Sequence, residues 1–178
     1  MADKLVTRRR LMIAALMLIP VVIASVVILV ACGRVNTKDD KHADVVLDGK
    51  KFHLELALDQ DTRFKGLSGR TEIPADGGML FVFPQPVTTA FVMRDCPVPI
   101  DIIFLDGAGR VVATHQMTID PRKAGESDAD YENRLKKYPS NFAAQFVIEL
   151  KGNTLDAVKV KKSDKIELDI AELKKRAK

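Results

Sequence analysis

The sequence predicts a mainly β domain with one or two short helices, preceded by an apolar N-terminal helix that serves as a signal or anchor. Most segments between residues 44 and 170 are short, rich in β-branched or aromatic residues, and separated by turn residues, which is typical of strands. Residues 51–58 carry Phe52, Leu54, Leu56 and Leu58 at every second position, with His53 and Glu55 on the other face, as a half-buried strand does. A domain of this length has room for a single core.

The N-terminus resembles an export signal. Basic residues at positions 4 and 8–10 precede an unbroken apolar run, residues 11–30. Ala31 and Cys32 then resemble the lipobox of bacterial lipoproteins, in which Cys32 is lipidated and becomes the first residue of the mature chain. An uncleaved helix is the alternative, because the run approaches the roughly 20 residues needed to span a bilayer.

Both alternatives predict an exported protein, because the basic cluster stays on the cytoplasmic side. We therefore expect a domain that is anchored to a bacterial membrane by an N-terminal lipid or helix and faces the periplasm or the cell exterior. The expected organisation is a signal peptide or anchor at 1–31, a flexible tether at 32–43, one β-rich domain at 44–170 and a solvated basic tail at 171–178.

The basic character of the chain comes mostly from the signal. The formal net charge is +4, from 28 basic and 24 acidic residues. Residues 1–31 hold four of the basic residues and one of the acidic ones, so 24 and 23 remain, a net charge of +1. Such a balance gives no support to nucleic-acid binding. Cys32 and Cys96 are the two cysteines, so lipidation of Cys32 would leave no intrachain disulfide.

The strands expected within the domain lie at 51–58, 79–83, 88–93, 101–105, 110–115, 142–150 and 165–169. Residues 106–109, Asp-Gly-Ala-Gly, predict a hairpin turn between two of them, because glycine accepts the positive φ that such turns need. Short helices are expected at 61–67 and, after an acidic cap, at 128–137.

Five motifs follow one another in the domain. They are Arg63-x-x-Gly66-Leu67-x-x-Arg70, residues 78–83 (Gly-Met-Leu-Phe-Val-Phe), Phe91-x-Met93, residues 99–104 (Pro-Ile-Asp-Ile-Ile-Phe) and residues 109–112 (Gly-Arg-Val-Val). In order and spacing this series resembles the bacterial family called domain of unknown function 192. The resemblance covers residues 45–170. It implies a compact antiparallel β-barrel or sandwich of jelly-roll type, frequently secreted, with no established activity.

The chain departs from the common pattern of that family in three places. Val92 stands where a tryptophan is usual, and Asp95-Cys96 replaces the usual Asn-Thr. A helix-like insert around residues 131–138 replaces a motif that contains a cysteine. Any role that rests on that aromatic residue or that cysteine does not carry over to this chain.

Charged residues interrupt the apolar strands of the motif block. Asp101 falls within an apolar run, and a buried charge is costly unless it has a partner. Arg63 and Arg70 are the candidate partners, since a guanidinium can hold a carboxylate through two parallel hydrogen bonds. Two interpretations stay open: an internal ion pair that fixes a loop onto the sheet, or a polar pocket of Arg63, Arg70, Asp95 and Asp101 for an anion or a carbohydrate.

A metal site is a second hypothesis. The spacing of Met93, His115 and Met117 is similar to the second part of the metal motif of periplasmic copper chaperones, and these soft ligands select Cu(I). That motif also needs a histidine at position 82, which is Val82 here. Methionines in strands also serve as core residues. Cys96 is a further candidate ligand, although the neighbouring carboxylate predicts a raised thiol pKa and an inert residue.

Three functions follow from these patterns. The leading one is an exported, membrane-anchored binding or structural protein of the bacterial cell envelope, and the alternative is a periplasmic Cu(I)-handling protein. The third is a hydrolase of envelope polymers, which would need two of Asp95, Asp101 and Glu149 in one cleft, about 5 to 10 Å apart. We lean away from an enzyme, because the sequence has no G-x-S-x-G, H-E-x-x-H or phosphate-loop motif.

Overall fold

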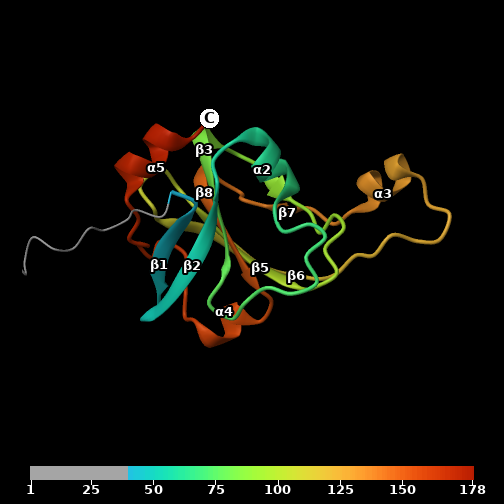
Figure 1. Ribbon diagram of the computed structural model, residues 1–178, viewed down its shortest axis with the longest axis horizontal. Coiled ribbons are helices and arrows are strands. Elements are labelled where there is room, and N and C mark those ends of the chain that lie inside the picture. Colours follow the sequence, from blue (N-terminus) through green and yellow to red (C-terminus); the bar gives the residue numbers. More distant parts are fainter. Residues whose placement is uncertain (1–39) are drawn as a thin grey trace, which may run out of the picture. The chain divides into compact units, whose positions relative to one another are not determined.

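The computed structural model describes residues 40–178. The predicted signal or anchor, the lipidation site Cys32 and most of the tether lie outside the described residues. Six strands form one sheet in the order β1 (His42–Leu47), β2 (Lys50–Ala57), β3 (Gly78–Val87), β8 (Ala144–Lys151), β5 (Ile100–Leu105) and β6 (Val111–Met117) (Figure 1). The short strands β4 (Ala90–Phe91) and β7 (Tyr138–Pro139) form a second sheet.

Four short helices accompany the strands in this part of the chain: α2 (Gln60–Lys65), α3 (Asp128–Arg134), α4 (Thr154–Ala157) and α5 (Ile170–Arg176). The helices α2 and α3 start at the capping side chains of Asp59 and Ser127, which accept hydrogen bonds from backbone amides of the first turn. Figure 1 shows α3 on a long excursion that leads away from the main sheet. Across residues 40–178, no helix has both the length and the apolar character needed to cross a membrane.

The large sheet is mixed and open. Neighbouring strands are antiparallel except β2 and β3, which run parallel. A parallel pair needs a crossover, and here the chain between the two strands makes α2 and a long loop. The strands β1 and β6 are edges and do not pair with each other, so the sheet does not close. The prediction of a mainly β domain is confirmed. Of the expected antiparallel barrel or sandwich, the closed barrel is wrong, and the sheet is mixed because β2 and β3 run parallel.

Apolar side chains cover both faces of the sheet. Face A is the side that carries Leu54, Leu80, Ile103 and Ile148, and Leu173 of α5 packs on it. Face B is the side that carries Met79, Phe81, Ile102 and Val147, and Leu67, Met93 and Tyr138 pack on it. Both clusters lie within the compact unit formed by residues 39–178, so this unit has the core it needs to fold on its own.

Three local predictions differ from the structure. The strand β1 begins at His42, inside the predicted tether, and its hairpin turn uses Asp48 and Gly49 at φ 47° and 76°. Residues 165–169 do not form a strand and make a single bridge between Arg110 and Lys165. The segment predicted as a solvated tail forms α5 instead, because Leu173 supplies an apolar contact with the core.

Candidate functional site

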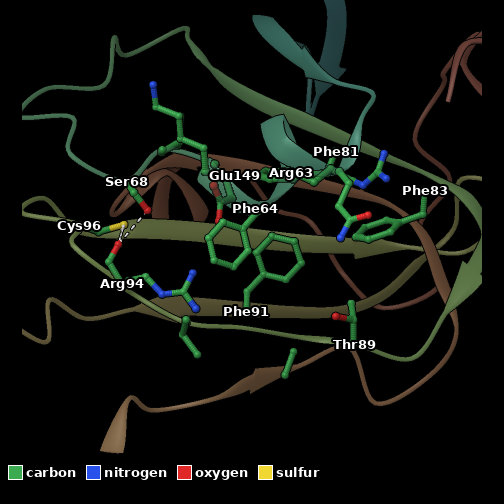
Figure 2. Close-up of a pocket in the computed structure, with 16 residues that line it drawn as sticks. Arg63, Phe64, Ser68, Phe81, Phe83, Thr89, Phe91, Arg94, Cys96 and Glu149 are labelled. Atoms are coloured by element: carbon green, nitrogen blue, oxygen red, sulfur yellow. Dashed lines mark hydrogen bonds between the residues drawn. The ribbon is translucent and has the colours of Figure 1, made fainter. Parts of the chain in front are cut away.

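A cavity of about 450 Å³ opens on face B, between α2, the loop that follows it and the segment around β4. Its walls are the rings of Phe64, Phe81, Phe83 and Phe91, and Figure 2 shows these rings gathered around it. Phe81 and Phe91 meet edge to face, with their ring centroids 5.1 Å apart. Phe64 is 72% exposed, so the mouth of the cavity presents apolar surface that a bound molecule could cover.

The carboxyl group of Glu149 lies at this cavity. Strand β8 places the side chain on face B, where its neighbours across the two ladders are Met79 and Ile102. The residue is 5% exposed, and its Oε2 has no hydrogen-bond partner within residues 40–178. Burial raises the pKa of Glu149 to about 8, against an opposing hydrogen bond from the Leu67 backbone N–H. At neutral pH the group is therefore mostly an uncharged acid.

Gly66 lets the backbone pass close to this acid. It ends α2 at φ 51°, a conformation that favours glycine. A Cβ at this position would lie 3.3 Å from Phe81 Cζ and 3.6 Å from Glu149 Oε2. Any side chain there would strain the turn and press against the Phe81 ring, so the glycine of the first motif shapes the cavity.

The mouth of the cavity carries cationic side chains that are largely engaged already. Arg94 makes a bidentate ion pair with Glu132 of α3, and its Cζ lies 4.6 Å from the centroid of the Phe64 ring. Arg63 donates hydrogen bonds to the backbone carbonyls of Leu58, Val82 and Lys178 at 2.7–2.9 Å. Both arginines therefore fix the walls.

Cys96 also lines the cavity. Its thiol donates a hydrogen bond to the Arg94 carbonyl at 3.3 Å. Burial first, and the Glu149 carboxyl second, raise the pKa of Cys96 to about 11. The thiol is therefore the poor nucleophile that the sequence predicts, but Asp95, the cause inferred from the sequence, contributes less than burial does.

The four residues of the predicted polar pocket do not come together. Arg70 pairs with Glu55 through two hydrogen bonds of 2.5 and 2.6 Å, rather than with Asp101. Asp101 is buried on face A, where its Oδ2 accepts a hydrogen bond from the Leu155 backbone N–H at 2.6 Å. The predicted arginine pair is thus wrong, because backbone amides at the start of α4 supply the partner that a buried carboxylate needs.

The other two members are also apart. Asp95 is exposed in a turn at φ 51°, and its backbone rather than its carboxylate makes the local contacts. Of the four residues of the predicted polar pocket, only Arg63 lines the cavity. The carboxylate pair required for a hydrolase is not formed by Asp101 and Glu149 either, since they lie on opposite faces of the sheet.

The predicted copper ligands lie on face B, where the two methionines pack in the apolar core. Met93 and Met117 are 1% and 2% exposed and belong to the same apolar cluster. His115 Nε2 lies 2.8 Å from the Pro139 carbonyl oxygen, and its ring meets the edge of Tyr138. Among the described residues, no group of three or more His, Cys, Asp or Glu side chains is placed to hold a metal ion. The Cu(I) hypothesis stays a prediction.

The sequence reasoning did not identify the aromatic cavity, and it considered Glu149 only as a hydrolase carboxylate. A signal was present, because Glu149 interrupts an apolar strand in the same way as Asp101 does. The aromatic walls come from α2, β3 and β4, and no local pattern shows that these elements meet.

Comparisons with known proteins identify a family without an assigned activity. The family model that matches, over residues 43–168, describes an uncharacterised ACR, domain of unknown function 192. A search of the curated proteins finds no match. A solved protein of unknown function from Novosphingobium aromaticivorans is 26% identical, with a TM-score of 0.59 over 71% of this chain and 85% of that chain.

A second solved structure supports the fold alone. It is a candidate transcription regulator from Sinorhizobium meliloti, 22% identical to this chain, with a TM-score of 0.57. The match covers 72% of this chain and 96% of that one.

Proposed function

Because the chain belongs to the family called domain of unknown function 192, whose name assigns no activity, we propose a function from the cavity itself. The protein binds a small organic molecule with an apolar ring system in the cavity beside Glu149. The observation that carries this proposal is a concave, phenylalanine-lined space with one buried, unpartnered polar atom at its wall. Small-molecule sites have this composition: mostly apolar walls with a few placed polar groups.

Binding is favoured over catalysis by the chemistry at the walls. The side chains that line the cavity include a single carboxylic acid, Glu149, and a thiol, Cys96, whose pKa is raised. A protonated thiol is no activated nucleophile, and Glu149 has no second carboxylate or histidine beside it among the side chains that line the cavity. The four rings offer apolar contact area instead, which is what retains a ligand.

We extend the proposal to the place where binding occurs. The basic cluster, the apolar run and Cys32 support an exported domain held at a bacterial membrane, so the ligand would be met in the cell envelope. A tethered domain with a concave, aromatic-lined site suits the role of an envelope binding protein.

Prodan, an uncharged naphthalene ketone whose fluorescence depends on polarity, tests the cavity in the isolated unit of residues 39–178. We expect saturable binding with a blue-shifted emission. Val92 lines the cavity from a loop and is half-buried, so Val92→Trp should fill part of the space. We expect this variant to bind Prodan about tenfold more weakly or worse.

Val46→Trp is the matched control, because Val46 is 54% exposed on the edge strand β1 and does not line the cavity. It should bind Prodan as the wild type does, and the two variants should melt within a few degrees of each other. Unchanged Prodan affinity in Val92→Trp would contradict the proposal, as would the absence of saturable binding to the wild type.

A further inference from the structure

The Oε2 atom of Glu149 is the feature of the cavity that the apolar walls do not explain. A buried polar atom without a partner is rare in folded proteins and is destabilising. The same strand could have carried a leucine at this position and packed against Phe81. A polar group in an apolar cavity is useful when a ligand supplies the missing hydrogen bond.

We propose that the cavity takes an uncharged molecule with an apolar ring system and one acceptor oxygen of the carbonyl type, and that Glu149 donates a hydrogen bond from Oε2 to that oxygen. This inference rests on the proposed binding function and names the ligand class. The Leu67 backbone N–H donates to the carboxyl group, and Oε2 is the oxygen left without a partner. The proton therefore belongs on Oε2, a buried atom of a side chain that lines the cavity.

The rim argues against a charged ligand. Arg63, Lys65 and Arg94 surround the mouth and would repel a cation. An anion would need a guanidinium with free donors pointing inward. Arg94 uses Nε and Nη2 on Glu132, and Arg63 uses Nη1 and Nη2 on backbone carbonyls. An anion beside Glu149 would also disfavour ionisation of a group that burial already keeps neutral.

The titratable side chains that line the cavity beside Glu149 are a thiol and three cations. On face B, β3 and β5 contribute apolar side chains beside it, and the loop after β4 contributes Cys96, whose pKa is about 11. Helix α2 contributes Arg63 and Lys65, and Arg94 is held by Glu132. Burial raises the pKa of Glu149 to about 8, so the donor is lost as the pH rises from about 6 to about 9.5.

Four naphthalenes that share a ring system and differ in their substituent test the inference by calorimetry on the unit of residues 39–178. They are 2-acetylnaphthalene, 2-isopropylnaphthalene, 2-naphthoate and 2-naphthyltrimethylammonium. At pH 6 we expect the ketone to bind about fivefold more tightly than the hydrocarbon of the same shape, and more tightly than either ion. At pH 9.5 this preference should disappear, because an ionised Glu149 cannot donate.

Glu149→Gln separates donation from structure. The amide keeps an N–H donor and has no proton to lose, so the preference for the ketone should persist at both pH values. Glu167→Gln, at an exposed position away from the cavity, is the matched control and should follow the wild type.

The outcomes separate the two claims. If none of the four probes binds at either pH, the proposed function itself fails. If ketone and hydrocarbon bind equally at pH 6, the cavity is a binding site but this inference is overturned. Tightest binding by the naphthoate or by the ammonium compound would overturn it as well.

Discussion

Two acidic side chains interrupt the central strands, and the fold treats them differently. Asp101 lies on face A, and its carboxylate accepts a hydrogen bond from a backbone N–H at the start of α4. Glu149 faces face B, where the cavity leaves its Oε2 without a partner in the described part of the chain. The burial of both is a general consequence of their place in apolar strands, whereas their hydrogen bonds depend on distant segments. At the scale of single residues, the difference between a structural acid and a candidate ligand-binding acid is therefore set by tertiary contacts.

Glu149 makes the stability of the domain depend on pH. Its pKa is raised from 4.5 to about 8 in the folded state, so the folded state holds a proton that the unfolded state loses. The stability that this proton contributes is fully present below about pH 4.5 and is lost as the pH rises to about 8. The wild type loses this stability as the pH rises from 4 to 9, and Glu149→Gln does not. Over this range we therefore expect the free energy of unfolding of Glu149→Gln to rise by roughly 3 to 5 kcal/mol relative to that of the wild type.

Urea unfolding of the two proteins at several pH values measures this difference. Glu167→Gln should keep a constant offset from the wild type, because Glu167 is exposed in both states. A constant offset for Glu149→Gln would mean that Glu149 ionises at its ordinary pKa in the folded protein.

Only part of the site was accessible from the sequence, for a physical reason. The rule that a charge in an apolar strand marks a special position correctly drew attention to Asp101 and applies equally to Glu149. The predicted pair of Asp101 with Arg70 is wrong, because Arg70 binds another carboxylate, Glu55. The parallel pairing of β2 and β3 places Glu55 beside Met79 on face B, whereas Asp101 lies on face A. Local spacing does not encode that pairing.

At the scale of elements, local turn chemistry was the most reliable guide. The predicted hairpin at residues 106–109 is present, with Asp106 Oδ1 accepting hydrogen bonds from the amides of Ala108 and Arg110. The hairpin of β1 and β2 carries an equally clear Asp-Gly signal at positions 48 and 49. The sequence analysis did not predict this hairpin, because it extended the polar tether to residue 43, past the start of β1 at His42.

The side chain of Asp101 joins β5 to α4, which we expect to be visible in stability. Asp101→Asn keeps the shape but turns one acceptor oxygen into a donor that faces the backbone amides of residues 153–155. We expect a loss of about 1 to 3 kcal/mol in free energy of unfolding, from unpaired buried donors.

Thermal and urea unfolding of Asp101→Asn measure the loss, with Asp76→Asn as control, because Asp76 is exposed. Prodan binding by Asp101→Asn should stay as in the wild type, since Asp101 lies on the face opposite the cavity. A variant as stable as the wild type would show that the contact with α4 contributes nothing.

For the whole molecule, the error about the barrel has an identifiable cause. In a closed β-barrel, one side of each strand faces outward and is usually polar. All six residues of β5 are buried here, and so are seven of the eight residues of β8. Strands that are apolar on both sides belong to a sheet that is covered on both faces. The barrel was implied by the family resemblance, whereas the apolar run 100–105 indicates a strand that is covered on both faces.

The anchoring of the molecule is the remaining prediction. Seven residues, 33–39, separate Cys32 from the described domain, and an extended chain of this length spans at most about 25 Å. A lipid on Cys32 would therefore hold the binding domain next to the membrane surface. We expect mass spectrometry of the N-terminal peptide from bacterial membranes to find Cys32 as the first residue, carrying acyl chains. We expect Cys32→Ser to accumulate as an unprocessed precursor that starts at Met1.

The alternatives give distinct results in the same measurement. A wild-type peptide that begins at Met1 in the membrane fraction would establish the uncleaved helix instead of the lipid. A soluble protein that lacks both the apolar run and acyl chains would contradict both forms of anchoring. Prodan binding by the unit of residues 39–178 is independent of this outcome, because both core clusters and the cavity lie within that unit. The cavity and the anchor can therefore be tested, and can fail, separately.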